Sequence, residues 1–108
     1  MTTKEFSRHI ENTFKECLVL AKKKNADYAG KEDPFKNFDS VKLIGVDAKH
    51  GIMVRLMDKI TRIGNLLEKE PKVVEEKIED TINDGINYLA ILKAKIHDEK
   101  ESNENKKN

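Results

Sequence analysis

The stretch "IEDTINDGINYLAIL", residues 78–92, decides the fold of this chain, because it is apolar along two sides of one predicted helix. Its large apolar side chains recur every three or four residues, which is the spacing of one face of an α-helix. That face consists of Ile78, Ile82, Ile86, Leu89, Leu92 and Ile96. The opposite face begins polar and then becomes small or apolar at Ala90, Ile91 and Ala94. A helix that is apolar on two sides is typical of a bundle centre or a subunit interface. We predict this long helix from about Val73 to Ile96.

Two more long helices are predicted before it. The first begins after Thr2 or Thr3, either of which can cap it, and ends near Lys24. Its apolar stripe is formed by Phe6, Ile10, Phe14, Cys17, Leu18 and Ala21. The next begins near Asp47, a suitable N-cap, and runs to about Glu68. Its stripe is formed by Met53, Leu56, Met57, Ile60, Ile63 and Leu67.

A short helix is expected between the first two long ones. Asp33-Pro34 is typical of an N-cap followed by proline at the first helical position, and Gly45 is a suitable stop. The sequence therefore predicts an all-α fold, a small bundle of three long helices plus one short helix. We expect a single domain over residues 1–97, with residues 98–108 as a polar, disordered tail.

Composition excludes several classes of function. The chain has 108 residues and a net charge of +1, from 21 basic and 20 acidic residues, which argues against an extended nucleic-acid surface. One cysteine cannot form an internal disulfide, and no apolar run reaches the roughly 18 residues of a membrane span. We expect a soluble cytoplasmic protein. A chain this short leaves much of its surface unburied, so we also expect a homo-oligomer in which another subunit covers apolar area.

A charged stripe marks the helix predicted over residues 47–68. At about 100° per residue, four side chains fall on one narrow line: Arg55, Asp58, Lys59 and Arg62. The stripe can be a solvated face with internal ion pairs. It can also be an anion site, because the guanidinium fork of arginine binds two phosphate oxygens at once.

Three carboxylates on the last helix raise the same question. Glu76, Asp80 and Asp84 are spaced i, i+4 and i+8, so they share one face and repel one another. Either a divalent cation such as Mg²⁺ or the cations of the neighbouring helix would relieve the repulsion. Two interpretations remain open: a salt-bridge network without a ligand, and a site that binds metal and phosphate. Asn87, a poor helix former on this face, favours a binding role or a close helix contact.

The loop "DYAGKEDPFKNF", residues 27–38, holds three of the six aromatic residues. An aromatic ring beside a phosphate site could stack on a nucleobase. We interpret Phe35 and Phe38 as anchors of the loop on the bundle. Tyr28 and Asn37 are the predicted ligand contacts.

Three stretches together resemble a known family. "NADYAGKEDPFKNF", "VRLMDKITRIGNLL" and "IEDTINDGINYLAIL" are similar to the phage and bacterial nucleotide-modification-associated domain, grouped with the MazG-like all-α nucleotide pyrophosphohydrolases. The resemblance implies a helical, usually oligomeric fold, a nucleotide site with Mg²⁺ and a phage or prophage setting. It implies acidic site residues at Asp58, Glu79, Asp80 and Asp84. It implies further site residues at Arg55, Lys59, Arg62, Tyr28, Asn37 and Phe38.

The sequence departs from the family on one helix. MazG-like enzymes carry an E-E-x-x-E pattern where this chain reads R-L-M-D-K-I-T-R, which leaves Asp58 as the only central acid. Metal-assisted hydrolysis needs carboxylates, so the change favours anion binding over cleavage.

Three functions follow as hypotheses. The first is a Mg²⁺-dependent nucleotide pyrophosphohydrolase with Asp58, Asp80 and Asp84 as catalytic residues, and with Glu79 as a further metal ligand. The second is non-catalytic sequestration of a cyclic or ADP-ribose-type nucleotide signal, which would counter bacterial antiphage defence. The third is a helical interaction module whose charged faces pair only with each other.

Overall fold

The computed structural model describes residues 1–28, 33–69 and 71–106; the side chains of residues 26–28, 71–77 and 106 lie outside the description. Four α-helices and one 3-10 helix follow in the order α1 (Thr3–Tyr28), α2 (Lys36–Asp39), η1 (Ser40–Ile44), α3 (Ala48–Leu67) and α4 (Pro71–Lys106). The described residues form no strand, so the predicted all-α class is confirmed. Among these described helices, none is long and apolar enough to cross a membrane.

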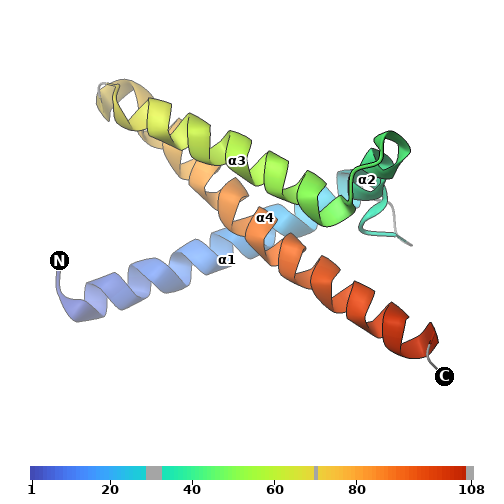
Figure 1. Cartoon of the computed structure of the whole chain (residues 1–108). Helices are drawn as coiled ribbons and strands as arrows, with labels where there is room; N and C mark the ends of the chain where they lie inside the picture. The colour runs from blue at the N-terminus through green and yellow to red at the C-terminus, as the bar shows by residue number, and fades with distance from the viewer. Residues whose placement is uncertain (29–32, 70, 107–108) are drawn as a thin grey trace.

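Helices α3 and α4 form an antiparallel hairpin (Figure 1). The α3 side of their contact is apolar, with Ile52, Leu56 and Leu66 buried. The predicted N-cap of α3 is confirmed, because the Asp47 carboxylate accepts a hydrogen bond from the backbone N–H of Lys49 at 2.8 Å. At the far end of the hairpin, Pro71 is the first residue of α4, a position where its missing N–H costs nothing.

The buried residues of α4 are not confined to its predicted isoleucine-rich face. Thr81, Gly85 and Lys95 are buried, whereas Leu89, of the predicted isoleucine-rich face, is 54% exposed. The small residues Thr81 and Gly85 let α3 approach closely, and Leu56 Cδ1 lies 3.8 Å from the position that a Gly85 Cβ would take. Small side chains that allow close packing, more than large apolar ones, therefore mark the side of α4 that contacts α3.

Helix α1 crosses α4 instead of lying along it (Figure 1). At the crossing, the amide of Asn87 donates to the Cys17 carbonyl oxygen at 3.0 Å, and Cys17 Sγ lies 3.6 Å from Asn83 Oδ1. Cys17 is 3% exposed, so its predicted place in the core is confirmed. The N-terminal end is capped as predicted, because Thr2 and Glu5 exchange side-chain and backbone hydrogen bonds at 3.0 and 3.1 Å.

The crossing makes a testable prediction about Cys17. Burial, followed by the nearby carboxylates of Glu16 and Asp84, raises the pKa of the Cys17 thiol above its ordinary value. Since the thiolate is the reactive form, we expect iodoacetamide at pH 8 to alkylate the native protein at least about tenfold more slowly than the urea-unfolded protein. Mass spectrometry of timed samples measures both rates. Equal rates would mean that α1 does not stay on α4.

Two predicted helix ends were wrong. Helix α1 continues past Lys24 to Tyr28, and α4 continues past Ile96 to Lys106. The predicted disordered tail is therefore helical through Lys106. Residues 98–106 hold no glycine or proline, and side-chain contacts support this part of α4: Lys49 forms an ion pair with Glu99 at 2.7 Å, and His97 Nε2 lies 3.1 Å from Glu101 Oε1.

The predicted short helix is present as α2 followed by η1. The Asp33 carboxylate accepts a hydrogen bond from the N–H of Phe35 at 3.0 Å, and the segment ends at Gly45, whose φ of 78° favours glycine. Gly51 of α3 lets η1 dock, because an added Cβ there would lie 2.9 Å from Val41 Cγ2. The segment is thus held against the start of α3, which brings Phe35 to Ser40 to one end of the hairpin.

Candidate functional site

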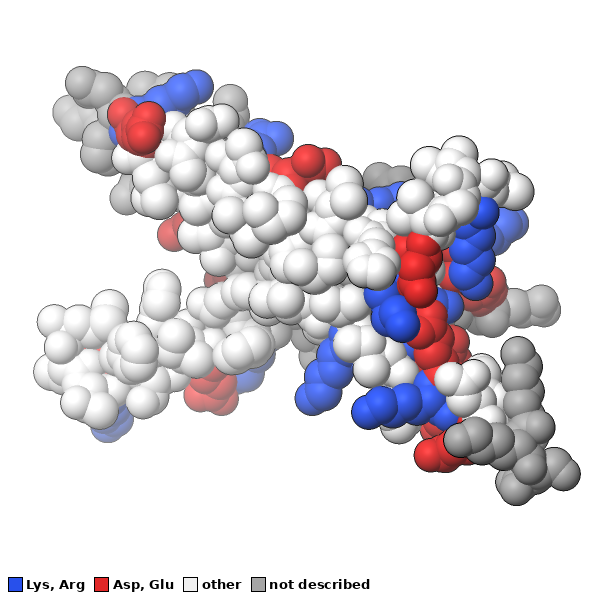
Figure 2. All heavy atoms as spheres, in the orientation of Figure 1, with Lys and Arg blue, Asp and Glu red and all other residues white. Residues whose placement is uncertain are grey.

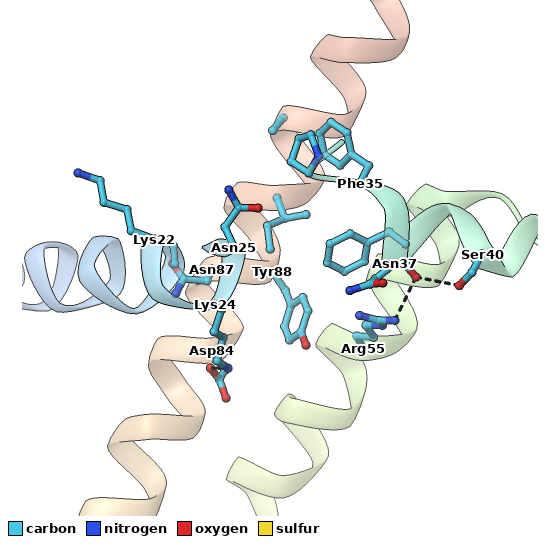
Figure 3. A pocket seen from close by; sticks show the side chains of 15 residues that line it. Lys22, Lys24, Asn25, Phe35, Asn37, Ser40, Arg55, Asp84, Asn87 and Tyr88 are labelled. Carbon is cyan, nitrogen blue, oxygen red and sulfur yellow. Dashed lines mark hydrogen bonds and ion pairs between the residues drawn. The ribbon is translucent and has the colours of Figure 1, made fainter. Parts of the chain in front are cut away.

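A cavity of about 740 Å³ lies where α1, the segment 34–40, α3 and α4 meet (Figure 3). Its size falls in the range of small-molecule sites in proteins. The residues that line it are Ala21, Lys22, Lys24, Asn25, Pro34, Phe35, Asn37, Phe38, Ser40, Arg55, Asp84, Asn87, Tyr88, Ile91 and Ala94. Four elements that are far apart in the sequence therefore share one hollow.

The segment that forms one wall is fixed to α4 by a buried lysine. Lys95 Nζ lies 3.1 Å from Asp39 Oδ1 and 4.9 Å from the centre of the Phe35 ring. A lysine ammonium is tolerated inside a protein only with such partners. The predicted anchoring role of Phe35 is consistent with this contact. The contact of Lys95 with Asp39 and Phe35 positions the wall without a ligand.

Aromatic rings form the next part of the site. Phe38 and Tyr88 meet edge to face with ring centres 6.4 Å apart. The guanidinium of Arg55 lies over the Phe38 ring at 4.7 Å, and it donates a hydrogen bond to the carbonyl oxygen of Asn37 at 3.4 Å. The contact with Phe38 holds the Arg55 guanidinium at the cavity wall, with both the ring and the charge beside the hollow.

The opposite side of the cavity carries a lysine–aspartate cluster. Asp84 forms two ion pairs: Lys24 Nζ of α1 lies 2.6 Å from Oδ1, and Lys59 Nζ of α3 lies 3.3 Å from Oδ2. In Figure 3, Lys24, Asn25 and Asp84 lie together across the hollow from Arg55, with Tyr88 between the two groups. Lys22 lies at the edge, with its side chain directed away from the other labelled residues (Figure 3).

The charge balance of the lining favours an anion. The lining includes three cations, Lys22, Lys24 and Arg55, and a single carboxylate, that of Asp84. Lys59 adds a further positive charge on the far side of that carboxylate. Because Asp84 is already matched by two lysines, the remaining positive charge is available to a ligand.

The predicted site residues fall into four groups. Five of them line the cavity: Asn37, Phe38, Arg55, Asp84 and Asn87. Lys59 lies beside it through its ion pair with Asp84. Four others are exposed and do not line it: Asp58, Arg62, Glu79 and Asp80. Tyr28 ends α1, and its side chain lies outside the described residues.

The predicted charged stripe of α3 is thus divided by the fold. Arg55 turns toward Asn37 and Phe38 at the cavity, and Lys59 turns toward Asp84 of α4. Asp58 and Arg62 are exposed. Asn87 has a structural contact as well, because its amide bonds the backbone of α1.

The described side chains form no preorganised site for a magnesium ion. No group of three or more His, Cys, Asp or Glu residues is arranged there to hold a metal ion. Asp84 is paired with lysines, and Asp58, Glu79 and Asp80 are spread over exposed surface. These residues do not fit a resident magnesium ion. An ion that arrives with a nucleotide needs only one or two carboxylates, for which Asp84 is the nearest candidate.

Sequence reasoning missed four residues that shape the cavity: Lys24, Asn25, Tyr88 and Ile91. The lysine run was interpreted as the end of α1, although a helix that continues to Tyr28 carries Lys24 and Asn25 to the site. For α4 there was a usable signal. Tyr88 and Ile91 follow Asp84 at i+4 and i+7, so they share a face with this predicted site residue.

No protein-family model, no curated protein and no solved structure matches the chain. The resemblance to the nucleotide-modification-associated domain therefore stays a prediction.

Proposed function

We propose that this protein binds a nucleotide in the cavity between α1, the segment 34–40, α3 and α4. The observation that carries the proposal is the arrangement of aromatic rings and an excess of positive charge around one hollow. A ligand with one flat ring and one or more phosphates matches both halves of that arrangement.

Each half of the ligand has a defined place in the proposal. The base lies against Phe38 and Tyr88, over an apolar floor that includes Ile91. A phosphate binds Arg55, whose guanidinium supplies several N–H donors toward one anion. Lys24 can turn from Asp84 to a second phosphate, because the two partners are joined only by an ion pair.

We favour retention of the nucleotide over its cleavage. Asp84 is matched by Lys24 and Lys59, and this pairing supports an anion site rather than a metal-activated water. The corresponding biological role is sequestration of a cyclic or ADP-ribose-type nucleotide signal of antiphage defence, in the cytoplasm of a bacterial host. A Mg²⁺-dependent pyrophosphohydrolase in which Asp84 binds the incoming ion is the second candidate.

We further propose that the working form is a homo-oligomer. The exposed large apolar side chains of α1, among them Phe6, Phe14 and Leu18, support this part of the proposal.

One experiment separates the two candidate functions. The protein is incubated with nucleoside triphosphates, cyclic dinucleotides and ADP-ribose-type nucleotides, with and without Mg²⁺, then separated from free ligand and denatured. We expect chromatography to recover one of these compounds intact, and only from the denatured protein. New products that require Mg²⁺ would support the hydrolase. If the protein neither retains nor converts any compound of the panel, nucleotide binding itself is refuted.

Asp84→Asn serves as the matched control in that panel. Asparagine keeps the size of the side chain and removes the charge that pairs with Lys24 and Lys59. Retention is expected to persist in this variant, since both lysines become available to phosphate. A hydrolase that uses Asp84 for Mg²⁺ would instead lose its turnover.

A further inference from the structure

The folded chain exposes more surface than a monomer of its mass normally does. Its accessible surface is 8788 Å², whereas a compact monomer of 12.4 kDa exposes about 6,100 Å². Its radius of gyration is 16.7 Å, against about 13 Å for a compact domain of this length. The excess of about 2,700 Å² is several times the roughly 800 Å² that each partner buries in a standard protein interface.

Large apolar side chains are exposed on all three long helices. Phe6, Ile10 and Phe14 project from α1, and Phe6 and Phe14 are 56% and 60% exposed. Met57 and Ile60 of α3 are exposed, as is Leu89 of α4. Monomeric proteins rarely expose contiguous apolar patches of such extent, and larger ones mark interaction sites.

The stripe of α1 belongs to the face that already packs at Cys17. Ile10, Phe14 and Cys17 follow one another at spacings of four and three, so they lie on one side of the helix. Cys17 is covered by α4, but the N-terminal half of α1 extends away from the rest of the chain (Figure 1). An isolated helical segment of this length is marginal in water, so a packing partner is needed to hold it.

The character of the surface favours a second copy over a membrane. In Figure 2 the middle of the face shown carries few charged side chains, while Lys, Arg, Asp and Glu gather over the C-terminal half of α4 and around α2. The polar side of α1 carries both signs, with Glu5, Glu11 and Glu16 beside Lys4, Arg8 and Lys15. A membrane-bound helix would instead be rich in Lys and Arg on that side. The net charge of only +1 also leaves little repulsion between copies.

Each copy carries both parts of a self-complementary contact, a projecting apolar helix and an apolar face on the α3–α4 hairpin. A two-fold axis lets each part cover its counterpart in the partner at the same time. We infer that two copies pair by packing the N-terminal half of α1, residues 3–16, across the exposed apolar face of the partner's α3–α4 hairpin. This inference rests on the homo-oligomeric part of the proposed function and is independent of nucleotide binding.

The test is the mass of the protein in solution without any nucleotide. Sedimentation equilibrium of the full chain is expected to give at least twice the chain mass at micromolar concentration. Phe6→Glu with Phe14→Glu puts two carboxylates into the proposed contact and is expected to halve that mass or more. Val19→Glu is the matched control, because Val19 is 69% exposed on the opposite side of α1 and should assemble as the unchanged protein does.

The outcomes are distinct even if the double variant does not fold. An assembly of identical chains melts at a temperature that rises with protein concentration, so we also expect a concentration-dependent Tm for the unchanged protein. Loss of folding in the double variant, with that dependence and an intact Val19→Glu control, supports the inference. A single-chain mass at all concentrations would overturn it. So would normal assembly of the double variant, or loss of assembly in both variants.

Discussion

Replacement of Arg55 with alanine is expected to weaken nucleotide binding by about 10- to 100-fold. A hydrogen bond to a charged group contributes about 1.5–3 kcal/mol, and each 1.4 kcal/mol is a factor of ten in affinity. Arg55 lines the cavity, and its guanidinium is held over Phe38 at 4.7 Å. Isothermal titration calorimetry with the nucleotide retained from the panel measures the change.

Arg62→Ala is the control for that change. Arg62 lies on the same helix and was predicted for the same site, but it is exposed and does not line the cavity. We expect its affinity to stay within about twofold, as for an exposed charge away from a contact. Arg55→Lys should fall between the two, because it keeps the charge and loses the fork. Equal losses for the two alanine variants would refute the cavity as the binding site.

Replacement of Ile52 with alanine is expected to lower the free energy of unfolding by about 2–5 kcal/mol, the usual cost for a buried isoleucine. Ile52 is 0% exposed and is the largest fully buried side chain among the described residues. Its loss would open a void in the core beside α3. Urea unfolding followed by circular dichroism, at one fixed protein concentration, gives the difference.

Val54→Ala provides the comparison on the same helix. Val54 is 60% exposed, so its truncation should change the free energy of unfolding by no more than about 0.5 kcal/mol. A loss below about 1 kcal/mol for Ile52→Ala would show that this part of α3 is not packed as described.

Local sequence signals predicted the elements well. Thr2, Asp33 and Asp47 all accept the backbone hydrogen bonds expected of them, and Gly45 ends the short helical segment. These features depend on residues within a few positions of one another, which is why one sequence is enough to predict them. The two wrong helix ends have the same origin, since Lys24 and Ile96 are followed by residues with no strong stop.

The faces of the helices could not be predicted in the same way. Periodicity ranks faces by hydrophobicity, and it selected the isoleucine-rich side of α4 over the one that holds Thr81, Gly85 and Lys95. Lys95 is a buried cation whose acceptable partner, Asp39, lies 56 positions away in the sequence. Only the fold brings such a pair together, and with it the wall of the cavity.

The candidate site was predicted in part for the same reason. Arg55, Asp84 and Asn87 line the cavity as expected, but the stripe of α3 was treated as one unit. One turn of helix separates Arg55 from Asp58, and the crossing angles of α1, α3 and α4 decide which of them reaches the hollow. Those angles depend on contacts such as Cys17 with Asn83, which join residues 66 positions apart.

That same separation has a consequence for biosynthesis. Helix α1 leaves the ribosome before α4, the helix it crosses at Cys17, has been made. At roughly 5–20 residues per second, several seconds pass between the two events. During this time the apolar side of α1 around Cys17 lacks the cover that α4 supplies, which leaves the nascent chain prone to aggregation.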